Sequence, residues 1–402
     1  MSNNTAQKLP TPSTAQIARS EQLTALIQAE IARNGGWIPF DQYMNAALYT
    51  PNLGYYANEL SPFSMWADQG DFITAPLLTP LFGVALAEQA LEVFELIKHV
   101  QPDAPANILE FGAGTGRLAA DMLRHLAERG VAVHYQIMEL SATLQAQQRA
   151  TITEALADIP HQHRFTWLSE LPQQFCGLML GNEVLDAMPV RLIGMDNGQA
   201  FERGVAVENH QLIWQERPSD EHLPMPAEWR DALRDSGARY LSETHTQQTA
   251  FIESLAQHLH IGVIVMIDYG FPSHEYYHPE RNRGTMMCHI QHVAHDEALY
   301  YPGVQDLTAH VNFSALVPAE NAAYQAIGYT SQANFLINNG ILDQLAQIEP
   351  EQQRVHANRV QRLLSEAEMG ELFKAMAWSK GIEFDEDETL QGFVRGDRLH
   401  RL

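Results

Sequence analysis

The sequence has almost no cysteine: only Cys176 and Cys288 occur among its 402 residues, each within an apolar run. Neither belongs to a Cys-x-x-Cys pair, and the His-Glu-x-x-His sequence of many zinc enzymes is absent. We therefore expect neither a disulfide framework nor a zinc site. The chain does contain 18 histidines, and His289, His292 and His295 recur three positions apart. That spacing alone is weak evidence for a metal, and we expect none.

The sequence also has few basic residues and no long hydrophobic run. Lys and Arg number 25 against 49 Asp and Glu, which gives a formal net charge of −24, and no local basic stripe interrupts it. Nucleic acid is therefore not an expected partner, because its phosphates would be repelled. The longest apolar run, residues 261–267, is far too short to span a bilayer, and the polar residues 1–16 lack the apolar core of a signal peptide. We expect a cytoplasmic protein with no membrane association.

A glycine-rich segment follows the short apolar run at residues 108–111. Its glycines stand at alternate positions: Gly112, Gly114 and Gly116. Glycine is favoured where a strand turns sharply into a helix and the backbone must approach a ligand. A dinucleotide-binding loop would need its third glycine at position 117, which is Arg117, so the pattern favours a nucleoside without a pyrophosphate. Glu110 favours a positively charged ligand, and S-adenosylmethionine, with its sulfonium and ammonium groups, satisfies both conditions.

Polar residues follow four apolar segments that the pattern predicts to be strands. These residues are Glu110, Glu139, Asn182 with Glu183, and Asp268. Helices and strands alternate along this part of the chain, which is typical of a parallel sheet whose ligands bind at the carboxyl ends of the strands. The predicted strand at residues 131–138 places Glu139 where a carboxylate accepts the O–H groups of a ribose. The alternative is that these residues only begin solvent-facing loops.

Two further pairs of polar residues have the spacing of a helical turn. Glu183 and Asp186 are three positions apart, so a helical turn would place both carboxylates on one side, where they could pair with a guanidinium. Equally, two carboxylates at a helix N-terminus could be favoured by the helix dipole alone. Asp306 and His310 are four apart, and His310 could accept a proton or form a structural hydrogen-bonded pair. Both alternatives stay open for each pair.

Taken together, several segments resemble the MidA-type class I methyltransferases, a family that includes a mitochondrial complex I assembly factor acting as a protein arginine methyltransferase. The likeness extends from about residue 38 onward. It is carried by Leu53-Gly54-Tyr55-Tyr56, Gly70-Asp71-Phe72-Ile73-Thr74-Ala75-Pro76, residues 110–116, Asn182-Glu183 with Asp186-Ala187-Met188-Pro189, Ile267-Asp268-Tyr269-Gly270, and Asp306-Leu307-Thr308-Ala309-His310-Val311.

The resemblance implies an α/β fold with the Rossmann-like, seven-stranded sheet of class I methyltransferases. We expect a disordered tail at 1–16, a helical N-terminal region at 17–104 and a methyltransferase domain at 105–402. The irregular, Pro- and Gly-rich part of the N-terminal region, residues 38–80, would form an active-site lid. An insertion at about 190–258 would contain a β-meander followed by helices, because turn residues separate short alternating runs there.

The residues and the resemblance together predict a site. The expected cofactor is S-adenosyl-L-methionine, held by Thr74 (through the resemblance alone), Glu110, Gly112, Gly114, Gly116, Glu139 and Asn182. The expected catalytic residues are Glu183, Asp186, Asp268 and His310. The expected partner is a client protein that carries the acceptor arginine, and a homodimer is compatible with the sequence. The Asn/Asp-Pro-Pro-aromatic signature of DNA amino-methylating enzymes is absent.

Two competing classes of function remain. One is a cofactor-binding assembly factor for a respiratory complex, which would hold a client protein and have little catalytic role. The other is a dehydrogenase with an altered glycine loop, which would bind NAD in place of S-adenosylhomocysteine.

Overall fold

The computed structural model describes residues 9–58, 74–385 and 388–402, which form two compact units. Unit 1 consists of Met1–Phe72, Ala187–Thr246 and Tyr277–Ala309, and unit 2 of Ile73–Asp186, Gln247–Tyr276 and His310–Leu402. The chain therefore leaves unit 2 twice, after Asp186 and after Tyr276. The expected N-terminal region at 17–104 is divided between the units, and most of the expected insertion at 190–258 belongs to unit 1.

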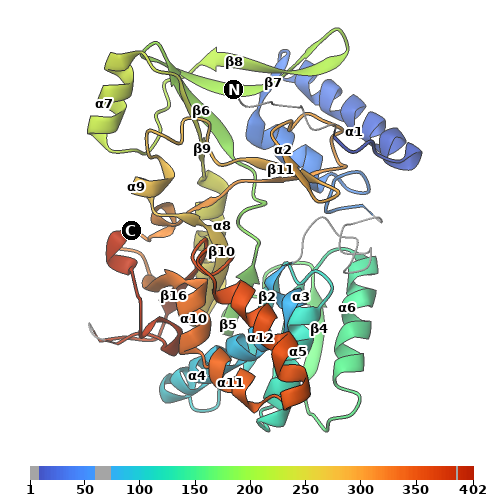
Figure 1. Cartoon of the computed structure of the whole chain (residues 1–402), viewed down its shortest axis with the longest axis vertical. Helices are drawn as coiled ribbons and strands as arrows, with labels where there is room; N and C mark the ends of the chain where they lie inside the picture. The colour runs from blue at the N-terminus through green and yellow to red at the C-terminus, as the bar shows by residue number, and fades with distance from the viewer. Residues whose placement is uncertain (1–8, 59–73, 386–387) are drawn as a thin grey trace. The chain divides into compact units, whose positions relative to one another are not determined.

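Unit 2 is built on an eight-stranded sheet (Figure 1). Seven strands form one row in the order β15-β16-β10-β5-β2-β3-β4. Their bounds are β2 (Asn107–Phe111), β3 (His134–Met138), β4 (Arg164–Leu168), β5 (Phe175–Asn182), β10 (Leu259–Phe271), β15 (Gln325–Ser331) and β16 (Phe373–Lys380). Neighbours from β4 to β10 are parallel, whereas β16 is antiparallel to both β10 and β15. The short β14 (Val311–Asn312) pairs with the end of β10 as the eighth strand, one more than the seven predicted.

Helices connect and cover the strands of this sheet. They are α3 (Ala75–Leu78), α4 (Pro80–Val100), α5 (Arg117–Glu128), α6 (Ala142–Ala155), α8 (Thr246–His258), α9 (Ser273–Tyr276), α10 (Gln332–Asn338), α11 (Ile341–Gln347) and α12 (Pro350–Leu364), with 3-10 turns at Phe313–Leu316, Gln391–Phe393 and Leu399–Arg401. The central strands are apolar along their length, as expected where helices bury both faces of a parallel sheet. The predicted Rossmann-like α/β fold is therefore confirmed.

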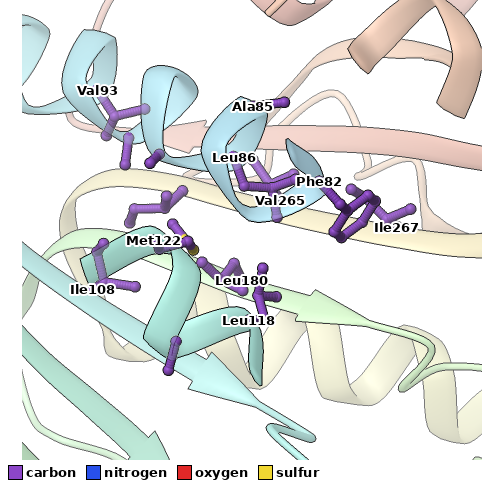
Figure 2. Packing of buried hydrophobic residues seen from close by; sticks show 14 of the residues in the cluster. Phe82, Ala85, Leu86, Val93, Ile108, Leu118, Met122, Leu180, Val265 and Ile267 are labelled. Atoms are coloured by element: carbon purple, nitrogen blue, oxygen red, sulfur yellow. The ribbon is translucent and has the colours of Figure 1, made fainter. Parts of the chain in front are cut away.

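The core of unit 2 lies between its central strands and the helices α4 and α5 (Figure 2). The contacting side chains are Phe82, Ala85, Leu86 and Val93 from α4, Leu118 and Met122 from α5, and Ile108, Leu180, Val265 and Ile267 from the strands, none more than 3% exposed. Full burial of a side chain such as Leu or Phe stabilises the fold by about 1.5–3 kcal/mol. This packing holds the start of α5, and therefore the glycine loop before it, against the sheet.

The register of the central strands places three predicted site residues at one edge of the sheet. Phe111, the last residue of β2, pairs with Met138 of β3 on one side and with Gly181 of β5 on the other. The next residues, Gly112, Glu139 and Asn182, therefore emerge at the same level. The strand order also reverses at β2, because the chain continues to β3 and β4 on one side and to β5 and β10 on the other. Ligands of open α/β sheets bind at such a point.

Unit 1 contains a five-stranded and a three-stranded sheet. The first has the order β1-β7-β6-β9 with β8 paired to β7, and the second the order β12-β11-β13. The bounds are β1 (Trp37–Pro39), β6 (Arg191–Asp196), β7 (Gln199–Glu208), β8 (Gln211–Pro218), β9 (Tyr240–Thr244), β11 (Met287–Ile290), β12 (Val293–His295) and β13 (Asp306–Thr308), with helices α1 (Thr14–Arg33), α2 (Phe40–Tyr49) and α7 (Ala227–Ser236).

The antiparallel β6, β7 and β8 form the predicted meander. Their turns contain Asn197, Gly198, Asn209 and His210, all with positive φ. The expectation that only helices follow the meander was wrong in part, because β9 forms between α7 and α8 and pairs with β6.

The N-terminal helix α1 begins before the expected end of the tail. Ser13 and Gln16 form a capping box, in which the Ser13 backbone N–H donates to Gln16 Oε1 (2.9 Å) and the Gln16 N–H donates to Ser13 Oγ (3.3 Å). These bonds satisfy donors that the first helical turn leaves open, so residues 14–16 are helical and not part of a tail. Residues 1–8 lie outside the described chain.

Residues 59–73 also lie outside the described chain, so the lid expected at 38–80 stays a prediction. Within the described ranges, no helix is long and apolar enough to cross a membrane. The same residues include no group of three or more His, Cys, Asp or Glu side chains that could hold a metal ion.

Candidate functional site

The glycine loop between β2 and α5 adopts a backbone conformation that favours glycine. The φ angles are 67° at Gly112, 51° at Gly114 and 80° at Gly116, all in the left-handed region. Two of these glycines are also closely packed by the protein itself. A Cβ atom on Gly116 would lie 2.9 Å from Cα of Gln148, and one on Gly112 would lie 2.8 Å from Cγ2 of Val184. The sequence interpretation attributed the glycines to a sharp turn and to the approach of a ligand. The structure confirms the turn and adds another cause, the approach of other chain segments.

Glu110 is a buried carboxyl group just before this loop. It is 2% exposed, and its Oε2 accepts a hydrogen bond of 2.9 Å from the Tyr135 hydroxyl. Burial raises the pKa of Glu110 to about 8, against the smaller opposing effect of the Tyr135 bond. A cation bound nearby would stabilise the ionised form of such a group. The position therefore fits the predicted preference for a positively charged ligand.

Glu139 follows β3 directly and is held by two hydrogen bonds. Its Oε1 accepts from the Ser141 N–H at 2.8 Å, and its Oε2 accepts from Gln148 Nε2 at 3.2 Å. The Glu139 N–H donates to the carbonyl of Leu168, the last residue of β4, so β3 and β4 end together at this edge of the sheet. A carboxylate has about four acceptor positions. Two are used here, which leaves capacity for two hydroxyl groups of a ligand.

The turn after β5 is not the helical turn that the sequence predicted. Glu183 has φ of 55°, in the left-handed region, and residues 183–190 form turns and extended chain. The Glu183 N–H still donates to the Ile267 carbonyl at 2.9 Å, as a continuation of the strand pairing. Its Oε1 accepts from Asn182 Nδ2 at 3.0 Å. The expectation that Glu183 and Asp186 share one face of a helix was therefore wrong.

Asp268, at the end of β10, is the residue that shapes this turn. Its Oδ2 accepts three consecutive backbone N–H groups, those of Val184 (3.1 Å), Leu185 (2.8 Å) and Asp186 (3.2 Å), and its Oδ1 accepts from the Tyr269 N–H (2.9 Å). Asp268 is fully buried. Because both oxygens are engaged with the backbone, this geometry favours a positioning role over the catalytic role expected from the sequence.

The acidic groups around this turn influence one another. Burial, and then the neighbouring carboxylates of Asp186 and Glu183, raise the pKa of Asp268 well above its ordinary value, while the amides of Leu185 and Asp186 act in the opposite direction. Asp186 is 6% exposed, and its Oδ2 accepts a hydrogen bond of 2.5 Å from the Tyr269 hydroxyl. Glu183 is the more accessible of the two predicted acceptor-binding carboxylates.

His310 lies beside aromatic residues that follow Asp268 in β10. Its ring meets that of Tyr269 edge-on, with centroids 5.0 Å apart, and stacks on Phe271 at 5.2 Å. The predicted helical pairing of Asp306 with His310 was wrong, because Asp306 begins β13 and His310 directly precedes β14, with no helical turn between them. Asp306 instead accepts a hydrogen bond of 2.7 Å from the Tyr56 hydroxyl within unit 1.

Thr74 is the N-cap of α3 in extended conformation and is half-buried. The four residues before it, which carry part of the family resemblance, lie outside the described chain. The structure thus groups Glu110, the glycine loop, Glu139, Asn182, Glu183 and Asp268 at one edge of the unit 2 sheet.

Sequence reasoning missed Gln148, which is fully buried and bonded to both Glu139 and the carbonyl of Gly114. A signal for it was present. Leu144, Gln148 and Ile152 recur every four residues and are the buried face of α6, so a glutamine stands within an apolar row. A polar residue in such a position needs hydrogen-bond partners inside the protein.

The central part of the chain, residues 85–332, matches the model of a family described as "Putative S-adenosyl-L-methionine-dependent methyltransferase". The match covers more than half of the sequence. The chain belongs to this family. Its cofactor is S-adenosyl-L-methionine, and it is a methyltransferase with a Rossmann-like fold, as the sequence predicted.

Similar solved structures and curated relatives agree with this assignment. A protein from Burkholderia thailandensis, described as a "likely methyl transferase" and bound to S-adenosyl-homocysteine, is 44% identical, with a TM-score of 0.86 over 98% of this chain and 100% of that one. The mitochondrial "Protein arginine methyltransferase NDUFAF7 homolog" of Drosophila melanogaster is 28% identical over 90% of this chain and 85% of the relative. The mouse NDUFAF7 protein is 26% identical over the same shares.

Proposed function

We propose that this methyltransferase transfers the methyl group of S-adenosylmethionine to an arginine side chain of a client protein. Two observations support the arginine acceptor. Relatives that span 85% or more of this chain are named protein arginine methyltransferases. In addition, the partly exposed carboxylate Glu183 stands at the carboxyl edge of β5, directly before Val184, whose side chain packs on the glycine loop, and a guanidinium could pair with it there.

The cofactor would occupy the edge of the sheet between β2 and β3. Glu110 would face its positive charge, the glycine loop would pass under it, and Glu139 would accept its ribose hydroxyls. Asn182, which lies level with Gly112 and Glu139 in the strand register, would contact it from the other side. Thr74 joins this set through the family resemblance.

The chain's own residues would orient the acceptor and handle its proton. A guanidinium is a poor nucleophile because it is protonated, with a pKa of about 13.8. Pairing with Glu183 would draw positive charge toward the far nitrogens and leave lone-pair character on the attacking nitrogen. Asp186 would support the pocket through its bond to Tyr269. His310, next to Tyr269, would receive the proton that the guanidinium loses.

Held by the glycine loop and Glu139, S-adenosylmethionine would supply the methyl group, exchanging its carbon–sulfur bond for the new carbon–nitrogen bond, and would leave as S-adenosylhomocysteine. Asp268 acts at a distance from these atoms, by fixing the backbone of residues 184–186.

The test is to incubate the protein with S-adenosylmethionine that carries a labelled methyl group and with a lysate, and to locate the label by mass spectrometry of peptides. We expect methylarginine in a client protein, and its loss in Glu183→Gln. The matched control is Glu170→Gln, at an exposed position in a loop. Label on lysine, nucleic acid, lipid or a small molecule would contradict the arginine acceptor. A client that is bound tightly but never labelled would favour the assembly-factor alternative.

A further inference from the structure

We propose that Gln148 is a positioning residue that holds the Glu139 carboxylate for the ribose hydroxyls and joins it to the glycine loop. This inference depends on the role proposed above for Glu139. Gln148 lies in the middle of α6, one turn after Leu144, and its side chain points to the carboxyl edge of the sheet through three hydrogen bonds.

These bonds join three separate segments. The Gln148 Nε2 group donates to Glu139 Oε2 at 3.2 Å, after β3, and to the Gly114 carbonyl at 3.0 Å, in the glycine loop. The Gln148 Oε1 atom accepts from Trp167 Nε1 at 2.7 Å, in β4. The glutamine therefore uses its oxygen and both N–H groups inside the protein, as a fully buried amide must if it is not to destabilise the fold.

The partners also determine which way the amide faces. The indole N–H of Trp167 can only donate, so the Gln148 oxygen must point toward it. The amide nitrogen then necessarily faces Glu139 and the Gly114 carbonyl, both of which can only accept. Arg149 lies over the Trp167 ring, with its Cζ 4.3 Å from the ring centroid, which further restrains the indole. The two N–H groups of the Gln148 amide are thus directed at the glycine loop and at Glu139, the two parts of the chain proposed to contact the nucleoside.

Packing adds a second link between α6 and the loop. A Cβ on Gly116 would lie 2.9 Å from Cα and 3.1 Å from Cβ of Gln148, so the loop rests directly on this helix. Leu144 and Ile152, on the same buried face, fix the helix in place. This contact involves Cα and Cβ of Gln148, which Gln148→Met retains, so the loop keeps its support when the amide alone is replaced.

The consequence for binding is preorganisation. Glu139 is held at one oxygen by the Ser141 N–H and at the other by Gln148, so its remaining acceptor positions are aimed before a ligand arrives. A ligand with two adjacent hydroxyls gains bonds to a carboxylate that need not be reoriented. A ligand without those hydroxyls gains nothing from this arrangement.

The experiment measures, by calorimetry, the affinity of the full chain for S-adenosylhomocysteine and for its analogue that lacks both ribose hydroxyls. We expect Gln148→Met, which keeps the volume of the side chain, to weaken S-adenosylhomocysteine binding about tenfold. Binding of the analogue should change less than about twofold, because Gln148 acts through Glu139. Gln147→Met, at the neighbouring position of α6 and outside these bonds, should leave both affinities unchanged.

A double-mutant cycle separates this inference from the proposed role of Glu139. In a Glu139→Ala background, Gln148→Met should change S-adenosylhomocysteine affinity less than about twofold. If Glu139→Ala alone has no effect, the proposed role of Glu139 is wrong. Two other results would overturn only the inference on Gln148. In one, Glu139→Ala weakens S-adenosylhomocysteine binding and Gln148→Met does not; in the other, Gln148→Met weakens the binding of both ligands equally.

If Gln148→Met fails to fold, Trp167→Phe provides a second test. It removes the donor that sets the amide orientation while keeping an aromatic ring. It should likewise weaken the binding of S-adenosylhomocysteine more than the binding of the analogue. Equal effects on the two affinities would overturn the proposal.

Discussion

Asp268 and Leu185 are joined by a hydrogen bond of 2.8 Å from the Leu185 amide nitrogen to Asp268 Oδ2. The N–H groups of Val184 and Asp186 reach the same oxygen, so one carboxylate fixes the backbone of three consecutive residues. This turn follows the strand that carries Asn182. It begins at Glu183 and places the side chain of Val184 beside the glycine loop. If Glu183 binds the acceptor as proposed, Asp268 would support that side of the site by fixing the turn.

Asp268→Asn should destabilise the protein. Both carboxylate oxygens of Asp268 accept backbone N–H groups, whereas asparagine has one oxygen, and its NH₂ group would face backbone N–H groups that need an acceptor. Each buried N–H left without an acceptor costs about 1–3 kcal/mol. Urea unfolding should show a loss of at least that size, while Asp235→Asn, at a site 76% exposed, should change stability by less than about 0.5 kcal/mol. Equal effects of the two changes would show that the buried bonds contribute little.

Gly116→Ala should affect both stability and cofactor binding. The φ of 80° is strained for alanine, and the new Cβ would meet the Gln148 backbone at 2.9 Å, which cannot rotate away as a side-chain end could. Gly130 provides a matched control, because its φ is 70° but nothing lies within 4 Å of a Cβ placed there. Gly130→Ala should cost only the conformational part, about 1–2 kcal/mol, and leave S-adenosylhomocysteine affinity unchanged.

Gly116→Ala should cost more stability than Gly130→Ala and weaken S-adenosylhomocysteine binding at least about tenfold, because the displaced loop and Gln148 both belong to the proposed site. Calorimetry on both folded variants gives the comparison. Unchanged affinity in a folded Gly116→Ala protein would place the cofactor away from this loop.

The pH dependence of stability should reveal Glu110. Its pKa is raised to about 8 in the folded protein, whereas the unfolded chain has the ordinary value of 4.5. Between these two values the folded state binds more protons than the unfolded state, so the free energy of unfolding falls as pH rises through this window. The protonated group thus stabilises the unliganded fold at low pH, and this contribution is lost as pH passes about 8.

Glu110→Gln should remove that slope, because glutamine stays neutral. The difference in unfolding free energy between the variant and the natural protein should therefore grow in favour of the variant from about pH 5 to about pH 8. Cofactor binding should change in the opposite direction, since a cationic ligand favours the ionised carboxylate. S-adenosylmethionine affinity of the natural protein should rise over this range, and that of the variant should not. Parallel stability curves would show that Glu110 does not keep its proton when folded.

Local patterns in the sequence were enough to predict the glycine loop, the strands that end in polar residues and the meander. Each depends on neighbouring residues, such as the alternating glycines at 112–116 or the turn residues at 197–198. The turn at residues 183–186 could not be predicted in the same way, because its shape comes from a carboxylate more than 80 positions later in the chain. A spacing of three residues indicates a helix only if nothing distant competes for the backbone N–H groups.

The same reason explains why Asp268 was expected to be catalytic. Its position at a strand end is visible in the sequence, but the register between β5 and β10 that brings the Leu185 amide to it is not. Gln148 could have been found from the buried row of α6, whereas its partners Gly114, Glu139 and Trp167 come from three other elements. The sequence thus predicts which polar residues stand at strand ends. Their hydrogen-bond partners come from distant segments and are known only from the folded structure.

The final prediction separates cofactor binding from methyl transfer. Glu139→Ala should weaken S-adenosylhomocysteine binding by about 1–3 kcal/mol, because two ribose hydroxyls would lose their charged acceptor. Glu183→Gln should leave that affinity within about twofold and sharply reduce labelling of the client, because a neutral amide cannot draw charge from a guanidinium. Each carboxylate is partly exposed at its own strand end, so neither change should unfold the protein.

Calorimetry and client labelling on the same two preparations provide the comparison, with thermal unfolding as a check on folding. Equal loss of cofactor binding in both variants would show that Glu183 belongs to the cofactor site and that the acceptor is held elsewhere. Full labelling by Glu183→Gln at normal cofactor affinity would leave Asp186 as the carboxylate for the acceptor. Its 2.5 Å bond to the Tyr269 hydroxyl would then have to break when the guanidinium binds.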